Sequence, residues 1–220
     1  MNWIDFFILF VLFVALLNGY RRGIFRELST FLGLAVGVII AVSNADSLVM
    51  MLEGKLNFSP SVLYVLSFAL IFLGCFVVFK IVGKYFYRMV KISPLKRSDK
   101  IGGGLVGVAK GLVVLSLLFL FFIFPTPFSS LDDALEGSSM AGSVRALVPF
   151  IYDNTSYLHP GSDQFLTEVQ KGILLSSASL YADDPERALK NKVVLGISDG
   201  DVETLDKLNR YFGKTQGELR

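Results

Sequence analysis

Two charged residues inside apolar runs are the first candidates for chemistry in this chain. Asp5 interrupts the run 2–20, and Lys110 is the only charge in the run 101–124. A charge at the centre of a membrane helix costs about 2.5–3.5 kcal/mol, so each one requires a partner or a role. Their depths, counted from the helix ends, are compatible with an ion pair. The alternative is that Asp5 lies in the outer head-group layer and Lys110 reaches the cytoplasmic interface.

Few other residues could act in catalysis or bind a metal ion. His159 is the only histidine, so a histidine-based catalytic triad or a metal site with two histidines cannot form within one chain. Cys75 is the only cysteine and excludes an internal disulfide. Asp199, Asp201 and Glu203 alternate as in calcium loops but lack the later bidentate glutamate. We therefore predict neither enzymatic activity nor a bound cofactor or metal.

The elements that must position these residues are membrane helices. Of the 220 residues, 53% are hydrophobic and only 18% are charged, with a mean hydropathy of +0.58. A spanning helix needs about 20 mainly apolar residues to cross a hydrocarbon core about 30 Å thick. The composition and the run lengths predict an all-α integral membrane protein with four transmembrane helices. The four runs are 2–20, 24–42, 62–82 and 101–124.

The distribution of charge predicts the orientation of these helices. Residues 1–124 carry a net charge of +7 and residues 125–220 a net charge of −5. The first and third connections are basic, and lysine and arginine are retained on the cytoplasmic side. We therefore expect a multi-pass protein of the cell inner membrane with both termini outside the cytoplasm. The basic residues lie between spans and form no compact groove, so we expect contact with membrane lipids and no nucleic acid.

Small residues recur every fourth position in two of the spans. Gly103, Gly107 and Gly111 share one face of the last run, and Gly33 and Gly37 share a face of the second. Lipid tails supply no hydrophobic drive between helices, so close backbone approach at such faces is a main source of packing energy. The partner helix can belong to the same chain, to another copy in a homo-oligomer or to an envelope protein.

A basic stripe follows the third run. Lys80, Lys84, Arg88 and Lys91 recur at helical spacing, with apolar residues on the opposite side. The pattern predicts a helix that continues along the cytoplasmic surface and contacts lipid head groups.

The chain divides after residue 124 into a four-helix membrane domain (1–124) and an acidic extracytoplasmic tail (125–220). Amphipathic segments at 144–152 and 165–173, near 183–185 and after 199 predict short helices in the tail. The first is expected along the outer interface, and Asp163 is the expected cap of the second. Their narrow apolar faces favour short helices with mobile links, in part disordered, over a packed domain.

Several residues in a fixed order together resemble the pattern of a known family. They are Asp5 in the first run, Gly19, Arg22, Gly23 and Glu27 around the first connection, Asp99, Lys100, Gly103, Gly107, Lys110 and Gly111 at the fourth run, and Ser139 and Ser143 after it. On these residues the chain is similar to the colicin V production (CvpA) family over about residues 1–155, although Lys100 stands where that family usually has arginine. The resemblance implies a bacterial inner-membrane protein linked to toxin production or export, or to envelope function, without an established catalytic activity.

Two functions from different classes remain at this point. In the first, the chain is a non-enzymatic membrane component that assembles through its glycine faces and its tail. In the second, it is a small channel or transporter component whose Asp5 and Lys110 line a polar path. The four spans show no internal duplication, which favours the first.

Overall fold

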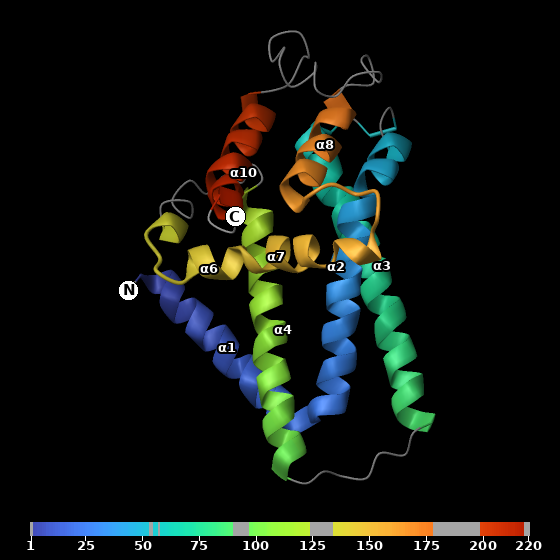
Figure 1. Cartoon of the computed structure of the whole chain (residues 1–220), viewed down its shortest axis with the longest axis vertical. Coiled ribbons are helices and arrows are strands. Elements are labelled where there is room, and N and C mark those ends of the chain that lie inside the picture. The colour runs from blue at the N-terminus through green and yellow to red at the C-terminus, as the bar shows by residue number, and fades with distance from the viewer. Residues whose placement is uncertain are drawn as a thin grey trace.

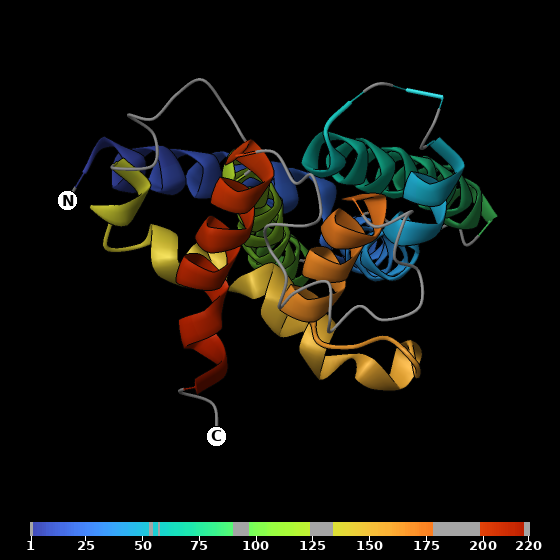
Figure 2. The same cartoon turned by 90° about the horizontal axis from the view of Figure 1, so that it is seen from above.

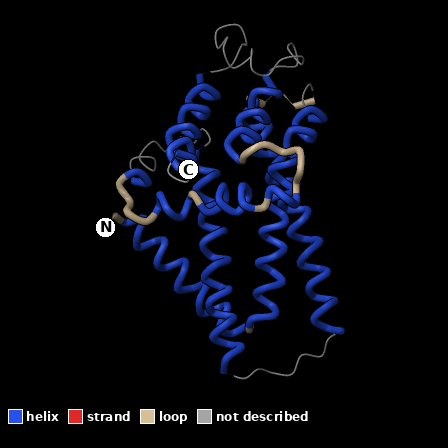
Figure 3. Tube along the Cα trace, viewed as in Figure 1, coloured by secondary structure: helices blue, strands red, loops and turns tan. Residues whose placement is uncertain are grey.

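Helices make up nearly all of the described part of this computed structural model, which covers residues 2–52, 55–56, 58–89, 97–123, 134–177 and 199–217 (Figure 3). Four of them are long and apolar enough to cross a membrane. The predicted all-α fold with four spans is confirmed. The spans are α1 (Trp3–Arg22), α2 (Ile24–Leu52), α3 (Pro60–Met89) and α4 (Arg97–Ile123).

The spans are arranged as two packed pairs (Figure 1). Helix α1 packs against α4, α2 packs against α3, and contacts between α2 and α4 join the pairs. A Cβ atom at Gly103 would lie 2.5 Å from the carbonyl oxygen of Gly19, so α1 and α4 touch backbone to backbone. Gly33 of α2 instead contacts a side chain, since a Cβ atom there would lie 2.7 Å from the Cβ of Phe79 in α3. Both glycine faces are thus occupied by helices of this chain.

The turn between α1 and α2 depends on a glycine. Gly23 has a φ of 79°, a conformation that L side chains rarely adopt, and it separates two helices that meet without a loop. Its amide donates to the carbonyl of Gly19 at 3.0 Å. This corner brings the end of α1 and the first turn of α2 together.

Helices α2 and α3 are longer than the apolar runs predicted. The sequence indicated spans at 24–42 and 62–82, whereas α2 continues to Leu52 and α3 begins at Pro60. Ala45 and Val49 in the additional turns are fully buried, because helices of the tail cover them. These turns extend the two helices beyond the level at which α1 begins (Figure 1).

The tail forms a layer around the extended ends of α2, α3 and α4. Helices α6 and α7 run across the spans, α8 lies beside α2 and α3, and α10 packs against α8 (Figures 1 and 2). Asp201 of α10 accepts a hydrogen bond from the amide of Ser61 in α3 at 3.1 Å. The bounds are α6 (Ala141–Arg145), α7 (Leu147–Asn154), η1 (Ser156–Leu158), α8 (Phe165–Ser177) and α10 (Asp199–Gly217).

This arrangement corrects the prediction of short helices without a packed core. Tyr152, Phe165 and Leu208 of the tail are buried in one apolar cluster with Val42 and Phe68 of the spans. The reason is that the ends of α2 and α3 beyond α1 each have an apolar face, which must be covered. The helical character of the tail is confirmed, while the helix expected near 183–185 lies outside the described residues.

The basic stripe after the third run belongs to α3 itself. As the pattern predicted, the helix continues past the third run: α3 reaches Met89 without a break, since the sequence has no proline between Pro60 and Pro94. Lys80 and Lys84 are exposed on its last turns. The side chain of Arg88 and the whole of Lys91 lie outside the described residues, so contact with lipid head groups stays a prediction.

Candidate functional site

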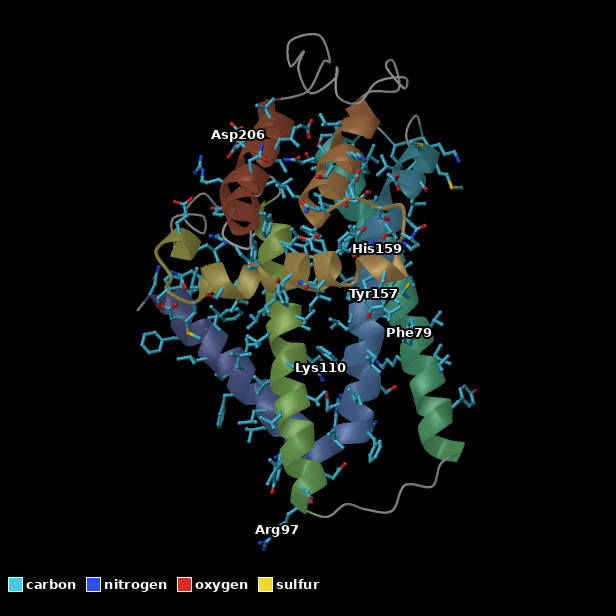
Figure 4. The ribbon with its side chains drawn as sticks, viewed as in Figure 1. Phe79, Arg97, Lys110, Tyr157, His159 and Asp206 are labelled. Atoms are coloured by element: carbon cyan, nitrogen blue, oxygen red, sulfur yellow. The ribbon has the colours of Figure 1, made fainter. Side chains whose placement is uncertain are left out.

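A buried ion pair connects α2 to α4. Glu27 lies in the first turn of α2, and its carboxylate accepts a hydrogen bond from the Lys110 ammonium, which reaches across from the middle of α4 (Figure 4). The Glu27 side chain is 0% exposed and that of Lys110 is 16% exposed. Arg22 at the end of α1 lies 3.5 Å from the other oxygen of Glu27. One carboxylate therefore binds cations from two other helices at the seam between the two helix pairs.

The surrounding residues fix the same corner. Asp99 accepts a hydrogen bond from the amide of Ile24 at 3.3 Å, which satisfies a free donor at the start of α2. The Lys100 ammonium lies 6.0 Å from the centre of the Tyr20 ring. Carboxylates at the beginning of α2 also interact favourably with its helix dipole. Apart from Asp5, the acids and cations that carry the family resemblance therefore gather toward one end of α1, α2 and α4.

Asp5 forms a second buried acid site, at the other end of α1. Its carboxylate accepts hydrogen bonds from the amide of Asn2 at 2.7 Å and from the hydroxyl of Ser138 at 2.5 Å. The amide of Met140 donates to it at 3.2 Å, and the hydroxyl of Ser139 lies 3.4 Å away. Asp5 thus caps α1 and fastens the beginning of the described tail to it.

The structure does not bring Asp5 and Lys110 together. The expected pair is wrong, because Asp5 is satisfied by serine hydroxyls and amides of the tail, and Lys110 by Glu27. Counting depth from the end of each helix misled the prediction, since α4 begins below the corner between α1 and α2 (Figure 1). Lys110 therefore lies nearer to the level of Glu27 than its position in the sequence suggests.

The sequence contained one signal for the correct partner. Glu27 is an acid in the first turn of the apolar run 24–42 and one of the residues that carry the family resemblance. A carboxylate in the first turn can bind a lysine from the middle of a neighbouring helix when that helix begins further from the membrane centre than its own helix does. This partner can be identified only when the positions of α2 and α4 relative to each other along the bundle axis are known. A single apolar run does not contain that information.

The other residues considered for chemistry from the sequence lie among packing contacts and helix-capping hydrogen bonds. The ring of His159 stacks on that of Tyr152 with centroids 4.2 Å apart, and its Nε2 lies 3.1 Å from the Tyr152 carbonyl oxygen. Asp153, and not Asp163, accepts from the amide of Phe165 at the start of α8. Burial raises the pKa of the Asp153 carboxyl, against the opposing effect of that hydrogen bond. Within the described ranges, no group of His, Cys, Asp and Glu could hold a metal ion.

Fold and site together define a multi-pass membrane protein with four spans, a covering layer of tail helices and an ion pair buried between its helix pairs. The chain belongs to the colicin V production protein family, whose model matches residues 4–149, more than half of its length. The match begins one residue before Asp5 and includes Glu27, Lys110 and Ser138. Searches among curated proteins and among solved structures returned no match.

Proposed function

We propose that this protein is a non-enzymatic structural component of the bacterial inner membrane, acting in toxin production or export or in the maintenance of the cell envelope. The family name supports the link to colicin V production. The observation that carries the structural role is the Glu27–Lys110 pair. It joins two helix pairs that otherwise meet along one seam, and its partners lie within the chain.

Polar contacts with the tail support the same role. Asp5 binds the segment around Ser138, and the Ser116 hydroxyl in α4 donates to the carbonyl of Arg145 at 2.9 Å. The hydroxyls of Ser43 in α2 and Tyr152 in α7 lie 3.0 Å apart. The tail layer is therefore fixed to the spans and can present a defined surface to envelope partners outside the cytoplasm. We expect those partners to bind there, because the glycine faces are already occupied.

The alternative is a small channel or transporter that uses Asp5 and Lys110. The two residues lie at different sites with different partners, which removes the shared path on which that hypothesis rested. A small cavity lined by Val42, Phe68, Leu120 and Phe165 is apolar and lies toward the tail. A conduction path would require polar lining groups.

The experiment combines stability and function of ion-pair variants. Glu27→Gln leaves the Lys110 ammonium without its partner and should lower stability by about 3–5 kcal/mol. Lys110→Met should also lower stability, but by less, because Arg22 remains 3.5 Å from the Glu27 carboxylate. The double variant should be more stable than either single variant and should restore the tolerance of cells to envelope stress. Melting temperature in one detergent and growth of complemented deletion cells measure the two effects. Lys84→Met, at an exposed lysine of α3, is the control and should change neither.

One outcome for the double variant would contradict the structural role. A double variant that folds as stably as the parent, accumulates normally and still leaves cells sensitive would mean that the charges themselves perform the function. That result would favour conduction or transport.

A further inference from the structure

Helix α7 and the turn η1 lie beside the spanning bundle and not on top of it. Seen from above, they project outside the outline of α2 and α4 (Figure 2). Along the bundle axis they lie at about the level where α1 begins (Figure 1). The Ser43–Tyr152 hydrogen bond fixes α7 at that level, together with the Ser116 hydroxyl, which accepts from the amide of Val148 at 3.1 Å. No described helix lies beneath this overhang on the membrane side.

The overhang carries the exposed apolar side chains of the tail. In the described part of the tail, the large hydrophobic residues on the surface are Phe150, Tyr157 and Leu158, with exposed fractions of 51%, 74% and 56%. Val148 and Tyr152, by contrast, face the bundle and are buried. Tyr157 lies on the side of α7 toward the lower half of the spans (Figure 4). In a membrane protein, that direction is the hydrocarbon side.

We propose that Phe150, Tyr157 and Leu158 insert into the lipid interface of the leaflet that the tail faces, so that α7 and η1 form an interfacial foot beside the bundle. Tyrosine suits this layer because its ring is apolar and its hydroxyl remains wet. Trp3, the first residue of α1, is 56% exposed, and α1 begins at about the level of α7 (Figure 1). The foot therefore extends an aromatic belt that α1 begins.

The foot recognises the bilayer through apolar contact and not through charge. Arg145 at its beginning stacks on the Tyr211 ring at 3.9 Å, so its guanidinium is engaged with α10. The acid nearest to its apolar residues, Asp153, caps α8. We therefore expect insertion into zwitterionic lipid, and added anionic lipid should not strengthen it.

Tryptophan fluorescence in reconstituted vesicles tests the foot. The background is Trp3→Phe, which leaves the chain without tryptophan, and the probe is Tyr157→Trp. Thr167→Trp on the exposed face of α8 is the matched control. In phosphatidylcholine brominated near the head-group end of its acyl chains, the probe should emit at shorter wavelength than the control and be quenched several-fold more. Equal emission, with equal quenching of both by aqueous iodide, would overturn the proposal.

Two further measurements separate lipid from protein contact. Leu158→Asp in the probe background should reduce quenching by brominated lipid several-fold, while circular dichroism verifies that the helices persist. Dilution of the protein into more lipid should leave the emission unchanged. Emission that shifts to longer wavelength on dilution would instead assign the surface to a second copy of the chain and overturn the proposal.

Discussion

Each buried acid binds groups that are distant along the chain. Glu27 accepts from Lys110, and Asp5 accepts from Ser138 and Met140. The chemistry of the donors differs: the first site contains a full cation, whereas the second is built from hydroxyls and amides. Because a carboxylate in a membrane is costly without donors, both sites stabilise the fold only in their complete form.

Asp5→Asn should therefore loosen the tail from α1. Asparagine has one acceptor oxygen where the carboxylate has two. Its NH₂ group would also face the N–H and O–H donors that now bind the second carboxylate oxygen. Hydrogen bonds to a charged group contribute about 1.5–3 kcal/mol each, so we expect a loss of about 2–3 kcal/mol. Differential scanning in detergent measures it, and faster cleavage after Glu136 by a glutamate-specific protease reports local release.

The control for this substitution is Asp46→Asn. The half-buried Asp46 of α2 accepts a hydrogen bond from the neighbouring amide of Ser47 and does not contact α1, so its replacement should change the melting temperature and the cleavage rate far less. Equal behaviour of the Asp5 and Asp46 variants would contradict the anchoring role of Asp5.

At the scale of the helices, the contact between α1 and α4 is set by glycine. A Cβ at Gly103 would lie 2.5 Å from the Gly19 carbonyl oxygen, and one at Gly107 would lie 2.5 Å from that of Ala15. Both neighbours are backbone atoms, so only a shift of a whole helix can make room. Gly74 of α3 differs, since a Cβ there meets nothing within 4 Å.

Gly103→Ala and Gly74→Ala should consequently have opposite effects. The first forces α1 and α4 apart and should destabilise the protein by about 1–3 kcal/mol. The second replaces glycine by the best helix former without a clash and should stabilise α3 by up to about 1 kcal/mol. Melting temperatures of the two variants in one detergent decide the matter. A shift in the same direction for both would mean that helix propensity, and not close packing, governs these positions.

The helices also show which parts of the fold the sequence can predict. Long, mainly apolar runs identified the four spans because membrane insertion depends on local hydrophobicity. The turns around Asp46 escaped prediction, since a polar loop and the polar face of a covered helix look alike. The tail core escaped it because Tyr152 and Phe165 pack on Val42 and Phe68, which belong to distant spans. The ion pair required the relative height of two helices, which is likewise a tertiary property.

At the scale of the whole molecule, the two ends of the helix bundle differ. The tail helices surround the end of α2 and the beginning of α3, and α1 begins level with α6 and α7, whereas the α1–α2 corner and the start of α4 lie at the opposite end (Figure 1). Basic residues gather at the second end, where Arg22, Arg26, Arg97 and Lys100 are exposed. We therefore predict that this second end lies in the cytoplasm and that both termini lie outside it.

Single cysteines test this orientation in a Cys75→Ala background. Ser47→Cys on α2 and Thr167→Cys on α8 should react with a membrane-impermeant thiol reagent in intact spheroplasts, because both positions are exposed at the end that holds the tail. Ser98→Cys at the start of α4 should react only after lysis. Joint reversal of the three results would invert the orientation and leave the fold intact. A split between Ser47 and Thr167 would contradict the fold itself, since α8 packs against α2 and the two positions cannot lie on opposite sides of a membrane.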